Sequence, residues 1–142
     1  MPILTAKLDN LRYLGPVMEV IVVPPKPIID LLISEGKQIP RLKAMALIDT
    51  GASSSCISQQ IVDFLNLVPF DEQTVFTAGG ESKQFFYDVG VMLPISQPNA
   101  HAIQAPCADL SRQPYQLLLG RDILTSCTLF YHGPENSFTI HQ

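Results

Sequence analysis

Short apolar runs alternate with proline- and glycine-containing turns along this chain, a pattern that predicts many strands and few helices. Val17 to Val23 is rich in valine and isoleucine, which favour strands because branched side chains pack well on a pleated surface. Leu42 to Ile48 forms a second apolar run that predicts a buried strand. Shorter runs predict further strands at Pro2–Leu8, Thr74–Ala78, Lys83–Leu93, Ala100–Ala105, Leu117–Leu119, Leu129–Tyr131 and Ser137–His141.

Helical spacing is confined to a few segments. Between Ser58 and Leu67, apolar residues recur every three or four positions, with Ser58 as the N-cap and Pro69 as the stop. Arg121 to Ser126 predicts a second, short helix near the C-terminus. For Ile28 to Ser34, the pattern leaves two alternatives open, one or two helical turns or an extended loop. The chain is therefore expected to be mainly β, as a small closed barrel or a sandwich.

Two pairs of predicted strands are separated by turn residues and are expected to form hairpins. The first has its turn at Gly79–Ser82, between the runs at Thr74–Ala78 and Lys83–Leu93. The second closes the chain across Gly133–Asn136.

Length and charge narrow the class of protein. With 142 residues the chain fits one domain, so we expect a single domain over residues 1–142. The net charge of −4 and the lack of any lysine and arginine run argue against nucleic acid and anionic membranes as partners. The N-terminus has no signal-peptide pattern and no apolar run is long enough to span a bilayer, so a cytoplasmic location is expected.

Cysteines and histidines give no sign of a metal site. Cys56, Cys107 and Cys127 are odd in number and widely spaced, which predicts reduced structural thiols rather than a disulfide framework or zinc ligands. The three histidines form no metal-binding motif either. We therefore expect neither metal nor cofactor, and hydrolysis by this chain would have to use carboxylates.

The segment with the clearest chemistry begins at Asp49, directly after the apolar run from Leu42 to Ile48. It reads Ile48-Asp49-Thr50-Gly51-Ala52-Ser53. The small residues after the acid let the backbone turn sharply and leave space beside the carboxylate for a ligand or a second chain. A plain surface turn is the alternative, because the tripeptide alone arises by chance; the apolar strand before it and the helix after it favour a functional site.

A second segment near the C-terminus has a related pattern. Leu118-Leu119-Gly120-Arg121-Asp122-Ile123-Leu124 places a glycine between apolar residues and a short helix. Together, Ile48 to Ala52 and Leu118 to Leu124 resemble the two signatures of retropepsin-like aspartic proteases, in the same order and at a similar separation. The resemblance covers roughly Leu42 to the C-terminus. It implies a closed acid-protease β-barrel of a single lobe, with one main α-helix, a short C-terminal helix and a flap hairpin at Gly79 and Gly80.

The resemblance also implies a mechanism. In this family two aspartates share one proton and activate a water that attacks the peptide bond, because like charges held close cannot both ionise easily. This chain offers one suitable acid: Asp88 lies in a strand-like run and lacks the hydroxyl residue that follows Asp49. The expected enzyme is therefore a homodimeric aspartic endopeptidase, in which Asp49 is the catalytic residue of each copy and the substrate is a peptide or protein.

Other site residues follow from the same resemblance. Thr50 hydroxyls would hydrogen-bond across the two-fold axis, and Gly51 would present its backbone to the substrate. Active-site support is expected from Thr50, Gly51, Ala52, Ser53, Gly120 and Arg121, and substrate or flap contacts from Gly51, Ser53, Ala78, Gly79 and Gly80. A plain hairpin turn is the alternative interpretation of the two hairpin glycines.

Departures from the retroviral pattern leave other hypotheses open. Ser53 stands where many retroviral members carry an acid that pairs with the signature arginine, so Arg121 needs another partner, with Asp122, Glu19 or a terminal group as candidates. The hairpin tip lacks a bulky apolar residue, and the segment from Pro24 to Pro40 is longer than its retroviral counterpart. A catalytically weak or inactive dimer that serves as a binding or scaffolding module is therefore the second hypothesis. An unrelated β-barrel that binds a small ligand is the third, but it leaves the second signature unexplained.

Overall fold

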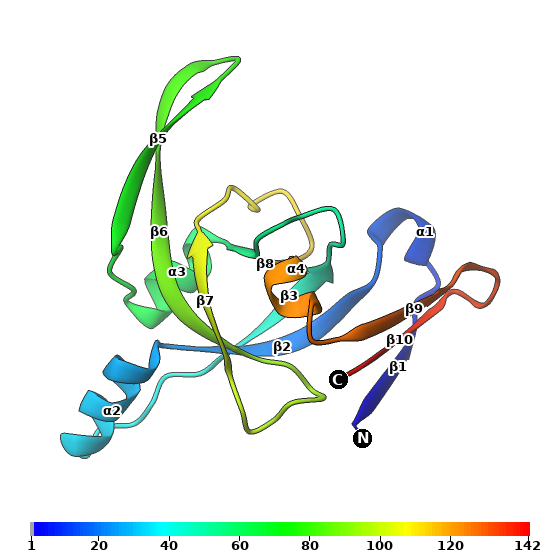
Figure 1. Ribbon diagram of the computed structural model, residues 1–142, viewed down its shortest axis with the longest axis horizontal. Helices are drawn as coiled ribbons and strands as arrows, with labels where there is room; N and C mark the ends of the chain where they lie inside the picture. Colours follow the sequence, from blue (N-terminus) through cyan, green and yellow to red (C-terminus); the bar gives the residue numbers. More distant parts are fainter. Residues whose placement is uncertain (1) are drawn as a thin grey trace.

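The computed structural model describes residues 2–142, apart from the side chain of Thr77, and is mainly β as predicted (Figure 1). The strands are β1 (Ile3–Lys7), β2 (Val17–Val23), β3 (Leu42–Ile48), β4 (Cys56–Ile57), β5 (Asp71–Thr77), β6 (Gly80–Met92), β7 (His101–Pro106), β8 (Leu117–Leu119), β9 (Thr128–His132) and β10 (Ser137–His141). The helices are α1 (Leu11–Leu14), α2 (Lys26–Ser34), α3 (Gln59–Leu65) and α4 (Arg121–Leu124), with a 3₁₀ turn η1 (Gly133–Glu135).

The strands form two sheets. The larger sheet has the order β4-β8-β3-β2-β6-β5, and β7 also pairs with β6; the small sheet has the order β1-β10-β9. Between β4 and the end of β7 there is one isolated bridge, from Ile57 to Cys107, where the Ala108 N–H donates to the Ile57 carbonyl at 2.8 Å. The named strands of residues 2–142 therefore do not form the closed barrel that we predicted, because β4 is only two residues long and cannot continue a ladder onto β7.

One hydrophobic cluster joins both sheets. Val20 and Val22 of β2 are buried and pack with Ala46 of β3, following the alternation expected of strands with one face in the core. Phe138 and Ile140 of the small sheet belong to the same cluster. The shared core fixes the position of β3, and with it the residue that follows β3.

The predicted helix after residue 58 is α3, whose N-cap Ser58 has extended dihedral angles and whose end is marked by Asn66 at φ +51°. The segment left open by the sequence is helix α2, and among the described residues its nine residues make it longer than α3 with seven. Pro27 fits the first turn of α2 because the amide that proline lacks needs no partner there.

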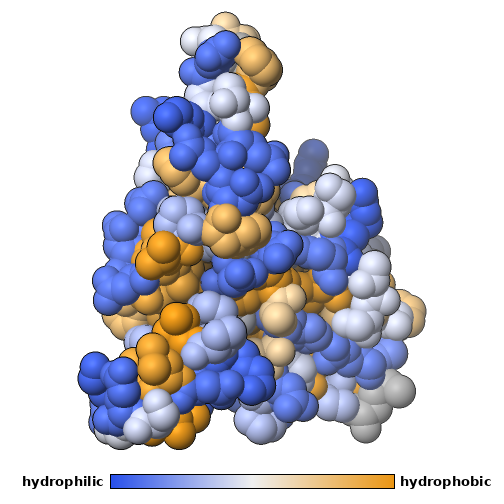
Figure 2. Space-filling model, turned by 60° about the vertical axis from the view of Figure 1, so that its left-hand side comes forward, coloured by the Kyte–Doolittle hydropathy of each residue, from blue (hydrophilic) through white to orange (hydrophobic). Residues whose placement is uncertain are grey.

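Helix α2 stands at the edge of the molecule, far from the small sheet (Figure 1). None of its residues is buried, and Ile28, Leu31 and Ile33 are exposed. Figure 2 shows apolar side chains gathered in the lower part of the view, on the side where α2 lies and below β5 and β6.

Strands β5 and β6 form a long hairpin that projects from the body (Figure 1). Its register runs from Asp71 opposite Phe86 to Thr77 opposite Gly80, so the turn is shorter than predicted. Gly80 adopts φ +106°, which L-residues rarely do. Phe76 is 77% exposed two residues from the turn, so a bulky apolar side chain lies near the tip, although the turn residues themselves carry none.

Candidate active site

Asp49 is the first residue after β3, and the strand pairing sets its position. β3 runs parallel to β8, with Leu47 opposite Leu118 and Ile48 opposite Leu119. The Asp49 N–H continues this ladder by donating to the Leu119 carbonyl at 2.9 Å. Parallel strands end at the same edge of a sheet, so the loop that begins at Asp49 and the loop that begins at Gly120 leave the sheet side by side.

The Asp49 carboxylate is half-buried and held from one side. The Gly51 N–H donates to Asp49 Oδ1 at 2.9 Å, and a Cβ at position 51 would lie 3.2 Å from the same oxygen. Within residues 2–142, no lysine or arginine forms an ion pair with Asp49, and no hydrogen bond reaches its Oδ2. The second oxygen is therefore available to a water, a ligand or another carboxylate.

Gly120 brings the second loop against the first. Its N–H donates to the Ser55 hydroxyl at 2.9 Å, and a Cβ at this position would lie 2.5 Å from the Ser54 carbonyl carbon. The next residue, Arg121, donates its N–H to the Ala52 carbonyl at 2.9 Å. This backbone contact requires glycine, because any side chain would meet main-chain atoms that cannot move aside.

Arg121 binds a backbone carbonyl. Its Nη1 donates to the Thr50 carbonyl at 2.7 Å, which holds the loop one residue beyond the acid. Neither Asp122 nor Glu19, the two acids considered as its partner, forms an ion pair with it in the described part of the chain. The carbonyl of Thr50 thus takes the place of the missing acid, and Ser53 is exposed.

Ser55 and Asp122 form a contact that the sequence analysis did not identify. Ser55 is fully buried, and Asp122 accepts hydrogen bonds from the Ser55 hydroxyl at 2.7 Å and the Ser55 N–H at 3.0 Å. Asp122 also accepts the Ile123 N–H at 3.0 Å, in the first turn of α4 where a negative charge is favourable. The available signals were an acid at the start of a predicted helix and a serine run after Asp49.

Two groups of residues considered in the sequence analysis lie apart from this site. Ala78, Gly79 and Gly80 are at the hairpin tip, which stands away from the end of β3 (Figure 1). Asp88 is exposed in the middle of β6, opposite Gln104 of β7. The described chain therefore brings Thr50, Gly51, Ala52, Gly120 and Arg121 together around Asp49.

The Cys56 thiol lies near the site, and its surroundings raise its pKa. Burial raises the pKa of Cys56, and the negative charge of Asp49 adds to this effect, whereas a hydrogen bond from the Leu118 backbone opposes it. All three cysteines are free.

Among the described residues there is no group of three or more histidine, cysteine, aspartate or glutamate side chains that could hold a metal. No helix in the described part of the chain is long and apolar enough to cross a membrane.

Comparison with known proteins adds a family to this geometry. The family model described as "gag-polyprotein putative aspartyl protease" matches residues 38–126, which include both loops. A search of curated proteins finds no match.

Three solved structures resemble the chain weakly. The EIAV protease complexed with the inhibitor HBY-793 is 19% identical, with 78% of this chain and 86% of that chain covered at a TM-score of 0.48. A retropepsin-like aspartic protease from Rickettsia conorii is 14% identical, with 89% and 93% covered at a TM-score of 0.48. Lpg0085 from Legionella pneumophila, a protein with unknown function (DUF785), is 21% identical, with 61% and 76% covered at a TM-score of 0.39.

Proposed function

Because this chain belongs to the gag-type family of aspartyl proteases, we propose that it is an aspartic endopeptidase that is active as a homodimer. The observation that carries the proposal is the lone Asp49 carboxylate, which is fixed through Oδ1 at the edge of the sheet and has Oδ2 unoccupied by any described residue. The chemistry of this family needs two such carboxylates. One chain provides one of them, and a second copy of the chain provides the other.

In the proposed dimer the two Asp49 side chains share one proton, because two like charges held close cannot both ionise easily. The ionised carboxylate takes a proton from a water between them, and the protonated one polarises the scissile carbonyl. The water oxygen then attacks the carbonyl carbon without a covalent intermediate. The pair titrates as a unit, so its two ionisations belong to the dimer rather than to either copy.

The loop around Asp49 is suited to meet a partner. Thr50 is exposed, and its carbonyl is already held by Arg121 at 2.7 Å, so its hydroxyl is left to bond across the two-fold axis. Gly51 presents its backbone carbonyl to the substrate, because its N–H is used by Asp49. Ala52 accepts the Arg121 N–H, and Ser53 lies on the exposed side of the loop, where it contacts the substrate.

We assign the β5–β6 hairpin the role of a flap that covers the substrate. In β6, pairing with β7 begins at Phe86 and pairing with β2 begins at Gly90. Between the hairpin turn and Phe86, the only described strand that pairs with β6 is therefore β5. Such a hairpin can move as a unit about its base. Its tip, Ala78 to Gly80, and the exposed ring of Phe76 then close over the bound peptide and exclude water.

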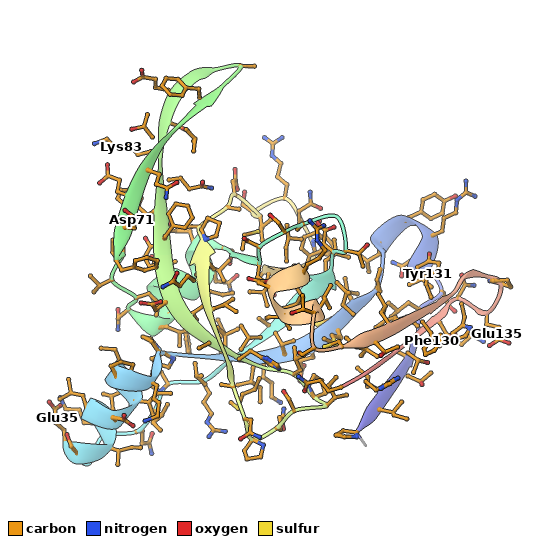
Figure 3. All side chains as sticks on the ribbon, viewed as in Figure 1. Glu35, Asp71, Lys83, Phe130, Tyr131 and Glu135 are labelled. Atoms are coloured by element: carbon orange, nitrogen blue, oxygen red, sulfur yellow. The ribbon has the colours of Figure 1, made fainter. Side chains whose placement is uncertain are left out.

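The free edge of β9 is the surface that we assign to the dimer contact. Among the described strands β9 pairs only with β10, and Phe130 and Tyr131 on it are 51% and 53% exposed (Figure 3). An unpaired edge strand is a template for another strand, and pairing with its own copy across a two-fold axis is self-complementary. Because β9 follows α4 after only three residues, this contact also sets the distance between the two Asp49 loops.

The whole chain, residues 1–142, is proposed to act as one domain of this dimer. The small sheet supports this, because its residues Phe138 and Ile140 share the core of the large sheet.

The test is cleavage of an unfolded protein or a peptide library at mildly acidic pH. Asp49→Asn is expected to remove cleavage while leaving the fold intact, and Asp88→Asn is the matched control, expected to cleave like the wild type. Unchanged cleavage by Asp49→Asn would falsify the assignment. A folded wild-type dimer that binds peptides but never cleaves them would instead support the binding-module hypothesis.

A further inference from the structure

A cavity of about 600 Å³ lies at the base of the hairpin, and no residue from 49 to 55 lines it. Its walls come from β6, from the start of α3 and from the segment that follows β7. A volume of this size is typical of pockets that bind small molecules or short peptides.

The hairpin wall is formed by one face of β6. Lys83, Phe85 and Tyr87 line the cavity at alternate positions, whereas Gln84 between them points to the opposite face of the strand. Lys83 projects from the hairpin (Figure 3) and pairs with Glu72 across the two strands at 3.2 Å. Phe85 is 37% exposed, so this wall offers an apolar surface to the cavity.

The other walls are rich in carboxamides. Gln59, Gln60, Gln113 and Gln116 line the cavity. Gln59 already bonds Asp63 at 2.9 Å, and Gln116 accepts the Met45 N–H at 2.9 Å. In the described part of the chain, the side chains of Gln60 and Gln113 have no hydrogen-bond partner, so both are free to bind a ligand.

Ser58 lines the cavity and has a buried hydroxyl that no described residue bonds. Buried polar side chains are nearly always paired, and an unpaired one costs about 1–3 kcal/mol. The hydroxyl is at the N-cap of α3 but makes no capping bond. The described residues therefore leave this hydroxyl unsatisfied, and either a water or a bound group can supply its partner.

Charge and chemistry together select the ligand class. Among the lining residues only Lys83 and Asp109 carry charges, and these are of opposite sign, so phosphates and polycations gain little here. Carboxamides both donate and accept hydrogen bonds, as peptide groups do, and the ring of Phe85 can cover an apolar side chain. We propose that this cavity binds a short, uncharged peptide segment.

Occupancy of the cavity is coupled to the hairpin. A bound segment contacts β6, the start of α3 and the segment after β7 at once, and so holds the hairpin base to the body. This consequence rests on the proposed function, in which the hairpin is a flap. The bound segment is either a distal part of the substrate itself or a separate peptide that regulates the flap.

Binding is tested on the Asp49→Asn protein, so that the result does not depend on cleavage. The probe is an equimolar mixture of N-acetylated, C-amidated tetrapeptides without charged residues. The readout is the rate at which iodoacetamide alkylates Cys107, a cavity residue with a half-buried thiol. Saturating peptide is expected to slow this alkylation by about tenfold, since contact with the ligand covers the sulfur.

Three variants locate the binding. Gln60→Ala and Gln113→Ala remove the free carboxamides, and each is expected to weaken protection by about threefold to tenfold, the effect of one lost hydrogen bond. Gln84→Ala, on the same strand but the opposite face, is the matched control and is expected to behave like its parent. Absence of protection at millimolar peptide, or equal protection in all variants, overturns the proposal.

The same assay separates the two sources of the peptide. If protection by a long unfolded protein disappears when a substrate peptide that itself gives no protection saturates the site around position 49 of the dimer, the segment belongs to the substrate; if protection persists, the cavity binds a peptide independently of that site. The protection by tetrapeptides does not depend on cleavage, so it stands or fails separately from the proposed protease activity.

Discussion

The Ser55 hydroxyl donates a 2.7 Å hydrogen bond to the Asp122 carboxylate, which lies 67 residues further along the chain. The same hydroxyl accepts the Gly120 N–H at 2.9 Å, so one buried oxygen connects the loop of Asp49 to the loop of the second signature. Strands β3 and β8 end where these two loops begin, so the contact fixes how the two loops face a partner.

Replacing Ser55 tests this connection. Ser55→Ala leaves the Gly120 N–H and one side of Asp122 without a partner, and we expect a loss of about 1–3 kcal/mol in the free energy of unfolding. Urea denaturation measures the change. The matched control is Ser54→Ala, because Ser54 is the adjacent residue and is exposed. Equal stability of the two variants would show that the connection does not contribute.

Gly120 permits the closest backbone approach at the site. Gly120→Ala places a Cβ 2.5 Å from the Ser54 carbonyl carbon and 2.7 Å from its oxygen, so the loops must separate. We expect a destabilisation of at least about 1–3 kcal/mol, as for other overpacked positions, and a loss of cleavage. Gly133→Ala is the control, because its Cβ meets only the Tyr131 ring at 3.5 Å. Thermal unfolding of both variants checks the difference.

The β9 edge gives a prediction about assembly. Phe130→Lys places like charges on both copies at the proposed contact and should shift the equilibrium toward monomer, measured by sedimentation over a range of concentrations. Phe64→Lys is the matched control, because Phe64 of α3 is equally exposed, at 51%, on a different element. If both variants remain dimeric to the same dilution as the wild type, the dimer uses another surface.

His101 predicts a pH dependence of stability. Burial lowers its pKa below the ordinary 6.5, so the unfolded chain binds more protons than the folded chain in mild acid. The contribution to stability is therefore complete above about pH 6.5 and is lost as the pH falls toward the folded-state pKa. His101→Gln should lose less stability than the wild type between about pH 7.5 and about pH 5.5. The free energy of unfolding is measured by urea denaturation at each pH. An equal loss of it in both proteins over this pH range would contradict the prediction.

Sequence reasoning predicted that Asp49 directly follows a buried strand because the signal is local: an apolar strand, an acid and small residues follow one another. It could not select Ser55, since Ser53, Ser54 and Ser55 look alike in sequence and only burial separates the third from the exposed first two. The partner of Arg121 was missed for a related reason. A backbone carbonyl such as that of Thr50 is present at every position and leaves no trace in the sequence.

The errors in the fold have physical causes of the same kind. Closure of the sheet depends on β4, whose two residues are too few to show a strand pattern. Helix α2 was ambiguous because prolines lie at and just before its start and none of its residues is buried, so no contact with the core distinguishes it from an extended loop. The cavity beside β6 is formed by segments distant in sequence, and only the folded chain brings them together.

The shared Asp49 site is tested most directly by mixing wild-type protein with Asp49→Asn protein in equal amounts, allowing the subunits to exchange, and measuring peptide cleavage. If two Asp49 carboxylates are required, only about one dimer in four carries both, and the rate falls to about a quarter of that of the same total amount of wild-type protein. A rate of about one half, in proportion to the wild-type chains present, would show that each chain cleaves alone and would contradict the shared site.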